Sequence, residues 1–500
     1  MPHTCSARAS RPALRLPATL PSPQHRCHNT LRSPNLASVA AIFTSIQARA
    51  QARDRTRARA LPFAKAHAPE VLLYSAARLI GLCVLSVMAH RANITGLLGK
   101  WDGAWYLGIA RHGYDTSFSY RADGSLINTN IVFFPLYPAL IRAFSWLGYL
   151  PAALLISWLS GIVAAIAIRS VGERLYDRRT GILLATLWGI LPTALVESMA
   201  YTESLLTALM ALALLFLLRG QWVAAGIASL FAGLTHPTGL AVAAAIDVCA
   251  LLAIIRRTDG WRPWLGAILA PLGTVTYLAW VGIELGQWDA WSVMQNRGWH
   301  NAPSVTGTWH EIVLILTKPQ QLGYYVALGV VLLALISAAA LTWGRNFNPA
   351  PNPGRHLNLD SNLSRDHAPA PDQYFALDSA LLLDHAPGSA LDQHLAPDPA
   401  PSLDQAPAPD HVRDRNLYLN RARLAVLILV WVSLAAALWS GPVYFHSKAR
   451  FLLPVFPLLL SLAVPLARQR LRALATLLGS AALASAWYGG YLLTIWTRSP

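Results

Sequence analysis

The stretch Trp101-Asp102-Gly103-Ala104-Trp105-Tyr106 follows an apolar segment, residues 71–90, that is long enough to cross a bilayer. Asp102 therefore stands among aromatic rings at the predicted edge of a membrane. An ionised acid there costs free energy unless it has a partner or a function. A second aromatic stretch, Phe133-Phe134-Pro135-Leu136-Tyr137-Pro138, comes later, and its two prolines interrupt a continuous helix.

The composition predicts an all-α polytopic membrane protein. Hydrophobic residues make up 54% of the 500 and charged residues only 13%, whereas soluble domains carry about 25% charged residues. The chain also has 18 Trp, and indole rings are typical of membrane–water interfaces.

Apolar segments of membrane-spanning length predict about eleven transmembrane helices. They lie near residues 71–90, 150–168, 181–200, 203–218, 221–235, 238–255, 263–284, 322–343, 423–440, 451–467 and 473–496. The segment 221–255 reads either as two short spans around His236-Pro237 or as one broken helix.

Arginines in the short connections orient this bundle. They fall at Arg169–Arg179, Arg219, Arg256–Arg262, Arg345, Arg421–Arg423 and Arg468–Arg472. With the N-terminus inside, all of these connections face the cytoplasm, as the positive-inside rule requires. Residues 91–149, 285–321 and 441–450 then lie outside, and the first of these is long enough to form a structured extracytoplasmic loop.

Two segments differ from the membrane core, which is predicted over 69–344 and 421–500. Residues 1–68 hold ten Arg and one Lys against Asp54, and we expect a disordered tail that meets anionic lipid headgroups. A basic cytosolic tail, an organelle transit peptide and a start codon placed too early all fit it. Residues 345–420 repeat Asp-His-Ala-Pro and Leu-Asp-Gln themes, which predicts a disordered cytoplasmic insert.

Asp102 has two interpretations on spacing alone. It can cap the helix that Gly103-Ala104-Trp105 begins. Alternatively, it faces a cavity beside the shelf formed by Trp105 and Tyr106 at helical spacing. Sugars stack on such shelves, and a carboxylate can accept a proton from a sugar hydroxyl.

Two further polar positions interrupt apolar sequence. Glu203 follows Tyr201-Thr202 on the predicted outer side, either as a helix cap or as a second polar group in the same cavity. His236, in Thr235-His236-Pro237, marks irregular backbone that is tolerated at membrane depth only when it is buried or lines a cavity. A satisfied core histidine is the simpler interpretation.

Ser447-Lys448-Ala449-Arg450 places two cations outside, against the positive-inside bias. Cations there need an anion, and the phosphate of a lipid is a candidate. Arg450 offers a bidentate fork and Lys448 a point charge. Ordinary contact with outer headgroups is the alternative.

Several chemistries lack sequence support. The chain has no phosphate-binding glycine loop, no His-Glu-x-x-His metal motif and no Gly-x-Ser-x-Gly nucleophile elbow. It also has no nucleic-acid-binding motif. The four cysteines lack metal spacing, and Cys83 and Cys249 are predicted to be small core residues. We expect no cofactor and no tightly bound metal, although a divalent ion beside a phosphate remains compatible.

The motifs together resemble the PIG-V family, the second mannosyltransferase of GPI assembly and its bacterial membrane relatives. The matching elements are Trp101-Asp102-Gly103 with Ile109–Tyr114, Phe133–Pro138, Tyr201–Ser204 and Ser447–Phe451. The resemblance spans about 71–343 and 421–496. Where the family has an arginine near the Thr-x-Pro-x-Gly break, this chain has His236.

The resemblance implies a GT-C-type helix bundle with an extracytoplasmic active site and a polyprenyl- or dolichyl-phosphate-linked sugar donor, typically of mannose. It implies that Asp102 is the catalytic base and not a helix cap. Lys448 and Arg450 would hold the leaving lipid phosphate. The remaining predicted substrate-binding residues are Trp101, Trp105, Tyr106, Phe134, Tyr137, Glu203 and His236.

The acceptor stays open among a glycolipid, a cell-wall glycan and a protein. The frequent Ala, Arg and Pro indicate a high-GC bacterial gene, which predicts the bacterial plasma membrane. Eukaryotic origin would instead make GPI assembly in the endoplasmic reticulum membrane the default. The rival functions are a transporter or flippase of a lipid-linked sugar and a non-catalytic cell-envelope protein.

Overall fold

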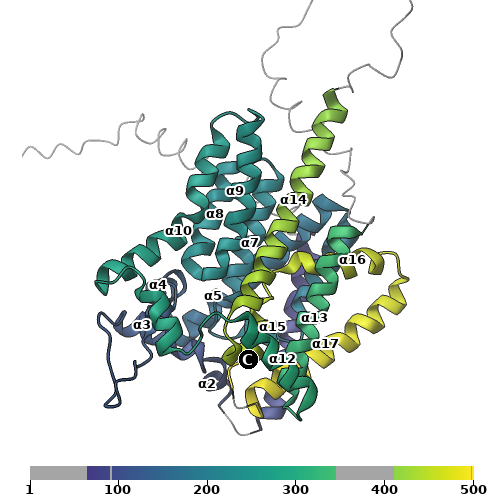
Figure 1. The fold of residues 1–500 in the computed structure, drawn as a ribbon. Coiled ribbons are helices and arrows are strands. Elements are labelled where there is room, and N and C mark those ends of the chain that lie inside the picture. Colours follow the sequence, from purple (N-terminus) through teal and green to yellow (C-terminus); the bar gives the residue numbers. More distant parts are fainter. Residues whose placement is uncertain (1–64, 91–92, 345–409, 497) are drawn as a thin grey trace, which may run out of the picture. The chain divides into compact units, whose positions relative to one another are not determined.

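The structure is a computed structural model that describes residues 65–90, 93–344, 410–496 and 498–500. The chain divides into two compact units, Met1–Ala66 and His67–Pro500. The second unit is built from helices, and its described residues contain no strand beyond one bridge pair, Tyr120 and Leu126 (Figure 1). The predicted all-α polytopic class is confirmed.

The first half of the bundle begins with the helix Lys65–Ala89. It continues with α2 (Ile94–Leu98), α3 (Asp102–His112), η1 (Asn130–Val132), α4 (Leu136–Ala143), η2 (Ser145–Leu147), α5 (Tyr149–Leu175), α6 (Arg178–Gly189), η3 (Ala194–Ser198), α7 (Glu203–Leu218), α8 (Trp222–Thr235), η4 (Pro237–Gly239) and α9 (Leu240–Ile255).

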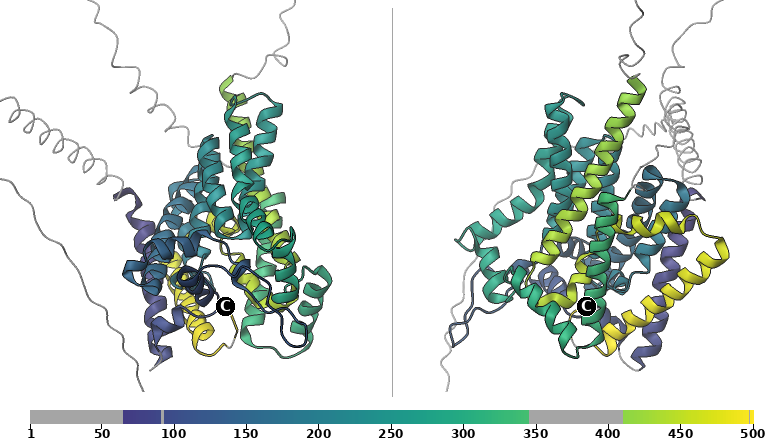
Figure 2. Two further views of the ribbon diagram at one scale, coloured as in Figure 1. Left: turned by 90° about the vertical axis from the view of Figure 1, so that its left-hand side faces the viewer. Right: turned by 45° about the vertical axis from the view of Figure 1, so that its right-hand side comes forward.

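The second half contains α10 (Arg262–Glu284), α11 (Ala290–Val293), η5 (Met294–Gly298), α12 (Val305–Thr317), α13 (Leu322–Trp343), α14 (Asp410–Trp439), η7 (Pro442–Ser447), α15 (Lys448–Phe451), η8 (Phe456–Leu459), α16 (Leu460–Leu466) and α17 (Leu471–Thr494). Figure 2 shows these helices from two further sides.

Six helices among the described residues are long and apolar enough to cross a membrane, and a seventh span results if the bent pair Pro442–Phe451 and Phe456–Leu466 counts as one. The helices α7 and α8 are apolar but shorter. The predicted number of about eleven spans is therefore too high for the described residues. Two of the predicted spans are not single helices. In 181–200, α6 ends at Gly189 and the chain continues through Pro192 into η3, and in 451–467, α15 ends at Phe451 and η8 precedes α16.

The polar break at His236-Pro237 separates two helices, α8 and α9. Residues 221–255 therefore form two helices and not one broken helix. Gly239 packs against the end of α8 so closely that a Cβ there would lie 2.6 Å from the carbonyl oxygen of Ala232. The chain therefore turns back on itself at this glycine.

Small residues bring other helices into close contact. A Cβ on Gly172 of α5 would lie 2.7 Å from the Cα of Gly181 in α6. Backbones approach this closely only where side chains are small, a common device for packing helices in membranes. The buried core is correspondingly rich in Ala and Leu from α5, α7, α9 and α14.

The predicted outer segment 91–149 is structured over its described residues, since it contains α2, α3 and α4. The predicted disordered insert 345–420 is corrected at its end, where residues 410–420 belong to α14. The remainder of that insert and the tail up to residue 64 lie outside the described residues.

Candidate active site

Three charged side chains from distant parts of the sequence meet in one cluster. Arg450 donates from Nη1 to Oδ2 of Asp102 at 2.6 Å, and its Nε lies 3.2 Å from Oε1 of Glu203. Asp102 begins α3, Glu203 begins α7 and Arg450 belongs to α15. The two acids that the sequence placed on the same side of the membrane therefore share one guanidinium.

Aromatic rings enclose this guanidinium. The Cζ of Arg450 lies 5.0 Å from the ring centroids of both Tyr201 and Phe451, within the range of a cation–π interaction. Ser499 adds a weak contact, with its Oγ 3.5 Å from Nη1 of Arg450. Figure 1 shows the C-terminus next to α15. Arg450 is consequently only 5% exposed, while the side chain of Asp102 is 24% exposed.

Asp102 is not the helix cap. The N-cap residue of α3 is Trp101, which has a φ of 54° and no side-chain capping hydrogen bond. A left-handed conformation is uncommon for a tryptophan, and here it leads directly into Asp102. The geometry therefore rejects the capping interpretation, because the carboxylate points to Arg450 and not to the backbone of α3.

Gly103 allows α3 to begin against the chain that precedes Glu203. A Cβ at Gly103 would lie 3.2 Å from the carbonyl oxygen of Ala200, and the N–H of Ala200 donates to the carbonyl of Leu98 at 2.9 Å. The backbone N–H of Asp102 also points to the hydroxyl of Tyr201 at 3.4 Å. This close approach brings the two acids to the same arginine.

An aromatic shelf continues from Asp102 along α3. The rings of Trp105 and Phe133 are stacked with centroids 5.8 Å apart, and Trp299 meets both of them edge-on. Tyr106 lies beneath, edge-on to Phe133 and with its hydroxyl 3.4 Å from Oγ1 of Thr202. Trp105, Phe133 and Trp299 are all partly exposed, so a ligand can contact them.

Two predicted aromatic residues lie elsewhere. Phe134 is 1% exposed and packs against Tyr277, with ring centroids 4.5 Å apart. Tyr137 is fully buried, and its hydroxyl bonds to Ala153 and Ser157. Phe133 takes the place expected of Phe134, because adjacent residues of extended backbone point to opposite sides.

His236 approaches the cluster only indirectly. Its Nδ1 lies 2.8 Å from Oγ1 of Thr238, and its ring is 6.1 Å from that of Phe451. The simpler interpretation of a satisfied histidine at a helix break describes this geometry.

Trp101 is half-buried, with the ammonium of Lys100 lying 5.8 Å from the centroid of its ring.

Lys448 is directed away from Asp102 and Glu203 and into the end of α14. Its ammonium donates to the carbonyl of Ala437 at 2.6 Å and to the carbonyl and hydroxyl of Ser440 at 2.8 Å each. The side chain is fully buried. An ammonium has three N–H donors, and these three contacts within the protein use all of them. Lys448 therefore has no free N–H for the phosphate contact that the sequence predicted.

We predict that Lys448→Met lowers the free energy of unfolding by about 3 kcal/mol, since it leaves buried carbonyls without donors and removes charged hydrogen bonds. Unfolding of the purified protein in detergent, followed by circular dichroism, measures the loss. Lys318→Met, at an exposed lysine, is the control. Equal stability of the two variants would contradict this role.

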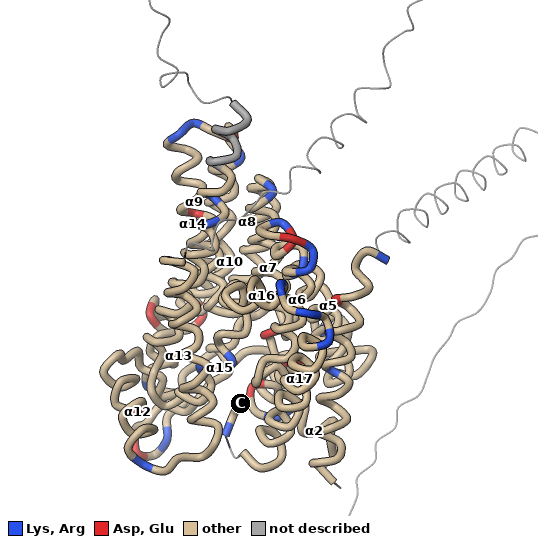
Figure 3. The backbone as a smooth tube through the Cα atoms, turned by 90° about the vertical axis from the view of Figure 1, so that its right-hand side faces the viewer, with Lys and Arg blue, Asp and Glu red and all other residues tan. Residues whose placement is uncertain are grey.

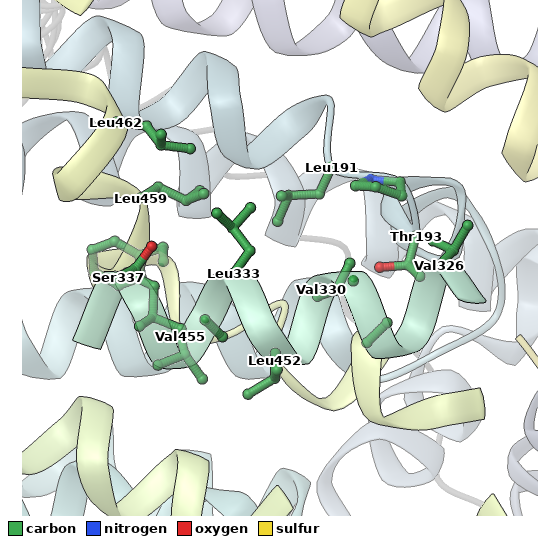
Figure 4. A pocket seen from close by; sticks show the side chains of 16 residues that line it. Leu191, Thr193, Val326, Val330, Leu333, Ser337, Leu452, Val455, Leu459 and Leu462 are labelled. Carbon is green, nitrogen blue, oxygen red and sulfur yellow. The ribbon is translucent and has the colours of Figure 1, made fainter. Parts of the chain in front are cut away.

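An apolar cavity of about 270 Å³ lies beside α15. It is bounded by α13, by the α15–α16 region and by the chain at Leu191–Thr193, with Val330, Ala449 and Leu452 among its lining residues (Figure 4). Because Ala449 and Leu452 flank Arg450 in sequence, the cavity adjoins the charged cluster.

The sequence reasoning missed Phe133, Trp299 and Ser499. A signal existed for Trp299, because it lies in a predicted outer segment rich in Trp and His. Ser499 carries no such signal. Within the described ranges, no group of three His, Cys, Asp or Glu side chains is placed to hold a metal ion.

The fold and site thus define a polytopic helical membrane protein with an Asp–Arg–Glu cluster beside an aromatic shelf. No model of a known protein family matches the sequence, and no curated protein matches it.

Among solved structures, the chain is similar to the oligosaccharyltransferase of Archaeoglobus fulgidus in its apo form, with 12% identity and a TM-score of 0.40 over 86% of this chain and 56% of that one. It is also similar to apo ArnT from Cupriavidus metallidurans, with 15% identity and a TM-score of 0.33 over 85% and 76%. The chain thus spans a little over half the length of the oligosaccharyltransferase. Similarity of this degree does not assign the chain to a family.

Proposed function

We propose that the protein is a membrane glycosyltransferase that moves a sugar, mannose by the PIG-V resemblance, from a polyprenyl-phosphate donor to an extracytoplasmic acceptor with inversion. The observation that carries the proposal is the contact between Arg450 and the two acids Asp102 and Glu203. It joins a candidate base to a candidate phosphate ligand beside a surface of partly exposed aromatic rings.

The reaction we propose is a single displacement. The acceptor hydroxyl attacks the anomeric carbon and gives its proton to Asp102, which acts as general base. The bond between the anomeric carbon and the phosphate oxygen breaks, and its electron pair leaves with the lipid phosphate. Arg450 stabilises the charge that builds on that phosphate.

The ion pair between Arg450 and Asp102 links the proposed phosphate ligand to the proposed base. A phosphate that approaches Arg450 competes with Asp102 for the guanidinium, so donor binding frees the carboxylate at the position where the acceptor proton must be accepted. Glu203 is held through Nε and is the more buried acid, 6% exposed. We propose that Glu203 keeps the guanidinium in place while the remaining N–H groups of Arg450 bind the phosphate.

The sugar ring would lie on Trp105, Phe133 and Trp299. Carbohydrates present C–H faces that contact aromatic rings, and polar edges that bond to nearby charges. This surface continues from the first turn of α3, where Asp102 is placed. We no longer propose Phe134 and Tyr137 as direct sugar contacts, since both are buried.

The lipid tail of the donor would enter the apolar cavity beside α15. Filling it with Val330→Trp is expected to raise the KM for donors with long polyprenyl chains by about tenfold, as a loss of roughly 1.4 kcal/mol implies, while kcat stays nearly unchanged. Transfer rates from long- and short-chain donors in detergent measure this effect. Leu332→Trp adds the same ring to the same helix at a residue that does not line the cavity. An equal KM change in both variants would contradict the tail site.

The overall proposal is tested with purified protein in vesicles that contain radiolabelled polyprenyl-phosphate mannose and a membrane glycolipid extract. Transfer predicts labelled product and release of polyprenyl phosphate. Labelled donor that crosses the bilayer unchanged, with no product, would overturn the proposal in favour of the transporter.

A further inference from the structure

A second guanidinium lies next to the Asp–Arg–Glu cluster. Arg498 follows α17 and directly precedes Ser499. The Oγ of Ser499 lies 3.5 Å from Nη1 of Arg450 and 3.5 Å from the hydroxyl of Tyr201. Figure 1 and Figure 3, which view the molecule at right angles, both show this end of the chain beside α15. Arg498 is exposed, whereas Arg450 is buried within the cluster.

The packing of Trp496 fixes the position of this segment. Trp496 is 4% exposed, and its ring centroid lies 5.6 Å from that of Tyr324 and 5.7 Å from that of His446. A Cβ at Gly323 would lie 2.8 Å from the indole ring, so a larger residue there would displace the indole from α13. Nε1 of Trp496 also donates to the carbonyl of Ser499 at 3.4 Å. The residues after α17 are therefore held against α13 and η7.

The charge of Arg498 is not neutralised by an acid. Its Cζ lies 5.9 Å from the ring centroid of Tyr324, and an aromatic ring attracts a cation without neutralising it. Glu311 also acts electrostatically on Tyr324. Neither Glu311 nor any other acid in the described ranges forms an ion pair with Arg498. The guanidinium is therefore available to an anion.

The cluster at Arg450 needs a further cation before it can attract a phosphate. One guanidinium there contacts two carboxylates, so the three side chains carry an excess of negative charge when both acids are ionised. A phosphate that approaches Arg450 is then repelled by Asp102 and Glu203. Lys448 does not compensate this charge, because its ammonium is directed into the end of α14. Arg498 can compensate it from beside the cluster.

We propose that Arg498 is a second ligand of the donor phosphate, which it holds together with Arg450. This inference rests on the proposed function, since it adds a residue to the same phosphate site. The apolar cavity lies where the lipid tail would have to continue. Ala449, next to Arg450, lines the cavity, and Tyr324 stands two residues before Val326, the first residue of α13 that lines it.

A second cation is most useful for the leaving group. The donor is a phosphodiester with one negative charge. When the bond to the anomeric carbon breaks, its electron pair stays on the phosphate oxygen and leaves a phosphomonoester, which carries a charge of about −1.5 to −2 at pH 7. Polyprenyl phosphate itself is therefore the ligand that should depend most strongly on Arg498.

Binding of polyprenyl phosphate and of uncharged polyprenol to the full-length protein in detergent tests the proposal, with native mass spectrometry as the readout. The ratio of the two affinities measures what the phosphate contributes. Arg498→Gln should lower this ratio about tenfold, the lower end for a charged hydrogen bond because Arg498 is exposed. Arg498→Lys should retain part of it, and polyprenol should bind equally to all variants.

Arg111→Gln is the matched control. Arg111 is also exposed, and its Cζ lies 5.1 Å from the ring centroid of Tyr149. It stands near the far end of α3 from Asp102, about 14 Å along the helix at 1.5 Å per residue. This variant should keep the wild-type ratio.

A wild-type ratio in Arg498→Gln, or an equal loss in Arg111→Gln, would overturn the proposal and leave the proposed transfer standing. Equal competition by phosphatidylglycerol would overturn it as well, since Arg498 would then bind ordinary headgroups. A ratio near one in the wild-type protein would overturn both this proposal and the phosphate role of Arg450. A ratio that depends on Arg498 in a protein without transfer activity would support the phosphate ligand and reject the transferase.

Discussion

Asp102→Asn is expected to lower the rate of sugar transfer by about 10²- to 10⁴-fold, the usual contribution of a positioned general base. Asparagine has nearly the same shape and can still accept a hydrogen bond from Arg450, so the start of α3 keeps its position. It cannot accept a proton. Initial rates of product formation with saturating donor measure the loss, and thermal unfolding shows that the variant is folded.

A control acid, Asp123, lies in the connection between α3 and η1. Asp123 is exposed, and hydrogen bonds from Ser125 lower the pKa of its carboxyl below the ordinary value. It is therefore ionised like a typical surface acid but makes no contact with Arg450. Asp123→Asn should leave the rate unchanged. Near wild-type transfer by Asp102→Asn would reject the base.

Arg450→Gln is expected to cost about 3–5 kcal/mol of stability, the loss typical when one member of a buried ion pair is removed. Glu203 is 6% exposed and would lose the cation that compensates its charge. It would then have to take up a proton or remain charged in a buried site, and either change costs free energy. Transfer should fall at the same time, since the leaving phosphate loses its ligand. Chemical unfolding in detergent measures the first effect and donor binding the second.

The double variant Arg450→Gln/Glu203→Gln separates the two effects. Removing the buried acid as well should recover much of the stability, because only Asp102, whose side chain is 24% exposed, then lacks a counter-ion. Donor binding should not recover. Stability that stays at the level of Arg450→Gln would show that the cost arises elsewhere, for example from the lost contacts with Tyr201 and Phe451.

The sequence predicted the helical class, because the length of apolar segments follows directly from the thickness of the bilayer. It also assigned Asp102, Glu203 and Arg450 to one side of the predicted bundle, and the structure brings these three side chains into contact. It failed at the break between α6 and η3. Residues 181–200 are apolar almost throughout, and Pro192 was the one local signal of interruption. Where the backbone is buried within the protein, a helix can end without polar residues in the sequence to mark the break.

Partner choice within the cluster was beyond the sequence. Lys448 and Arg450 are two residues apart and equally cationic, yet positions i and i+2 of a helix do not share a face. One side chain therefore enters the end of α14 and the other meets the two acids. Phe133 and Phe134 divide in the same way. Only the packed tertiary structure decides which member of each pair reaches the site.

The ion pair between Asp102 and Arg450 joins residues that are 348 positions apart, and this has a consequence for how the protein is made. At about 5–20 residues per second, a ribosome needs roughly 20–70 s to progress from one to the other. From the synthesis of Glu203 until that of Arg450, both acids are present in the chain without their counter-ion. A chain truncated after α13 should therefore be recognised as incomplete by membrane proteases, and the arrival of α15 is the step that supplies the counter-ion of both acids.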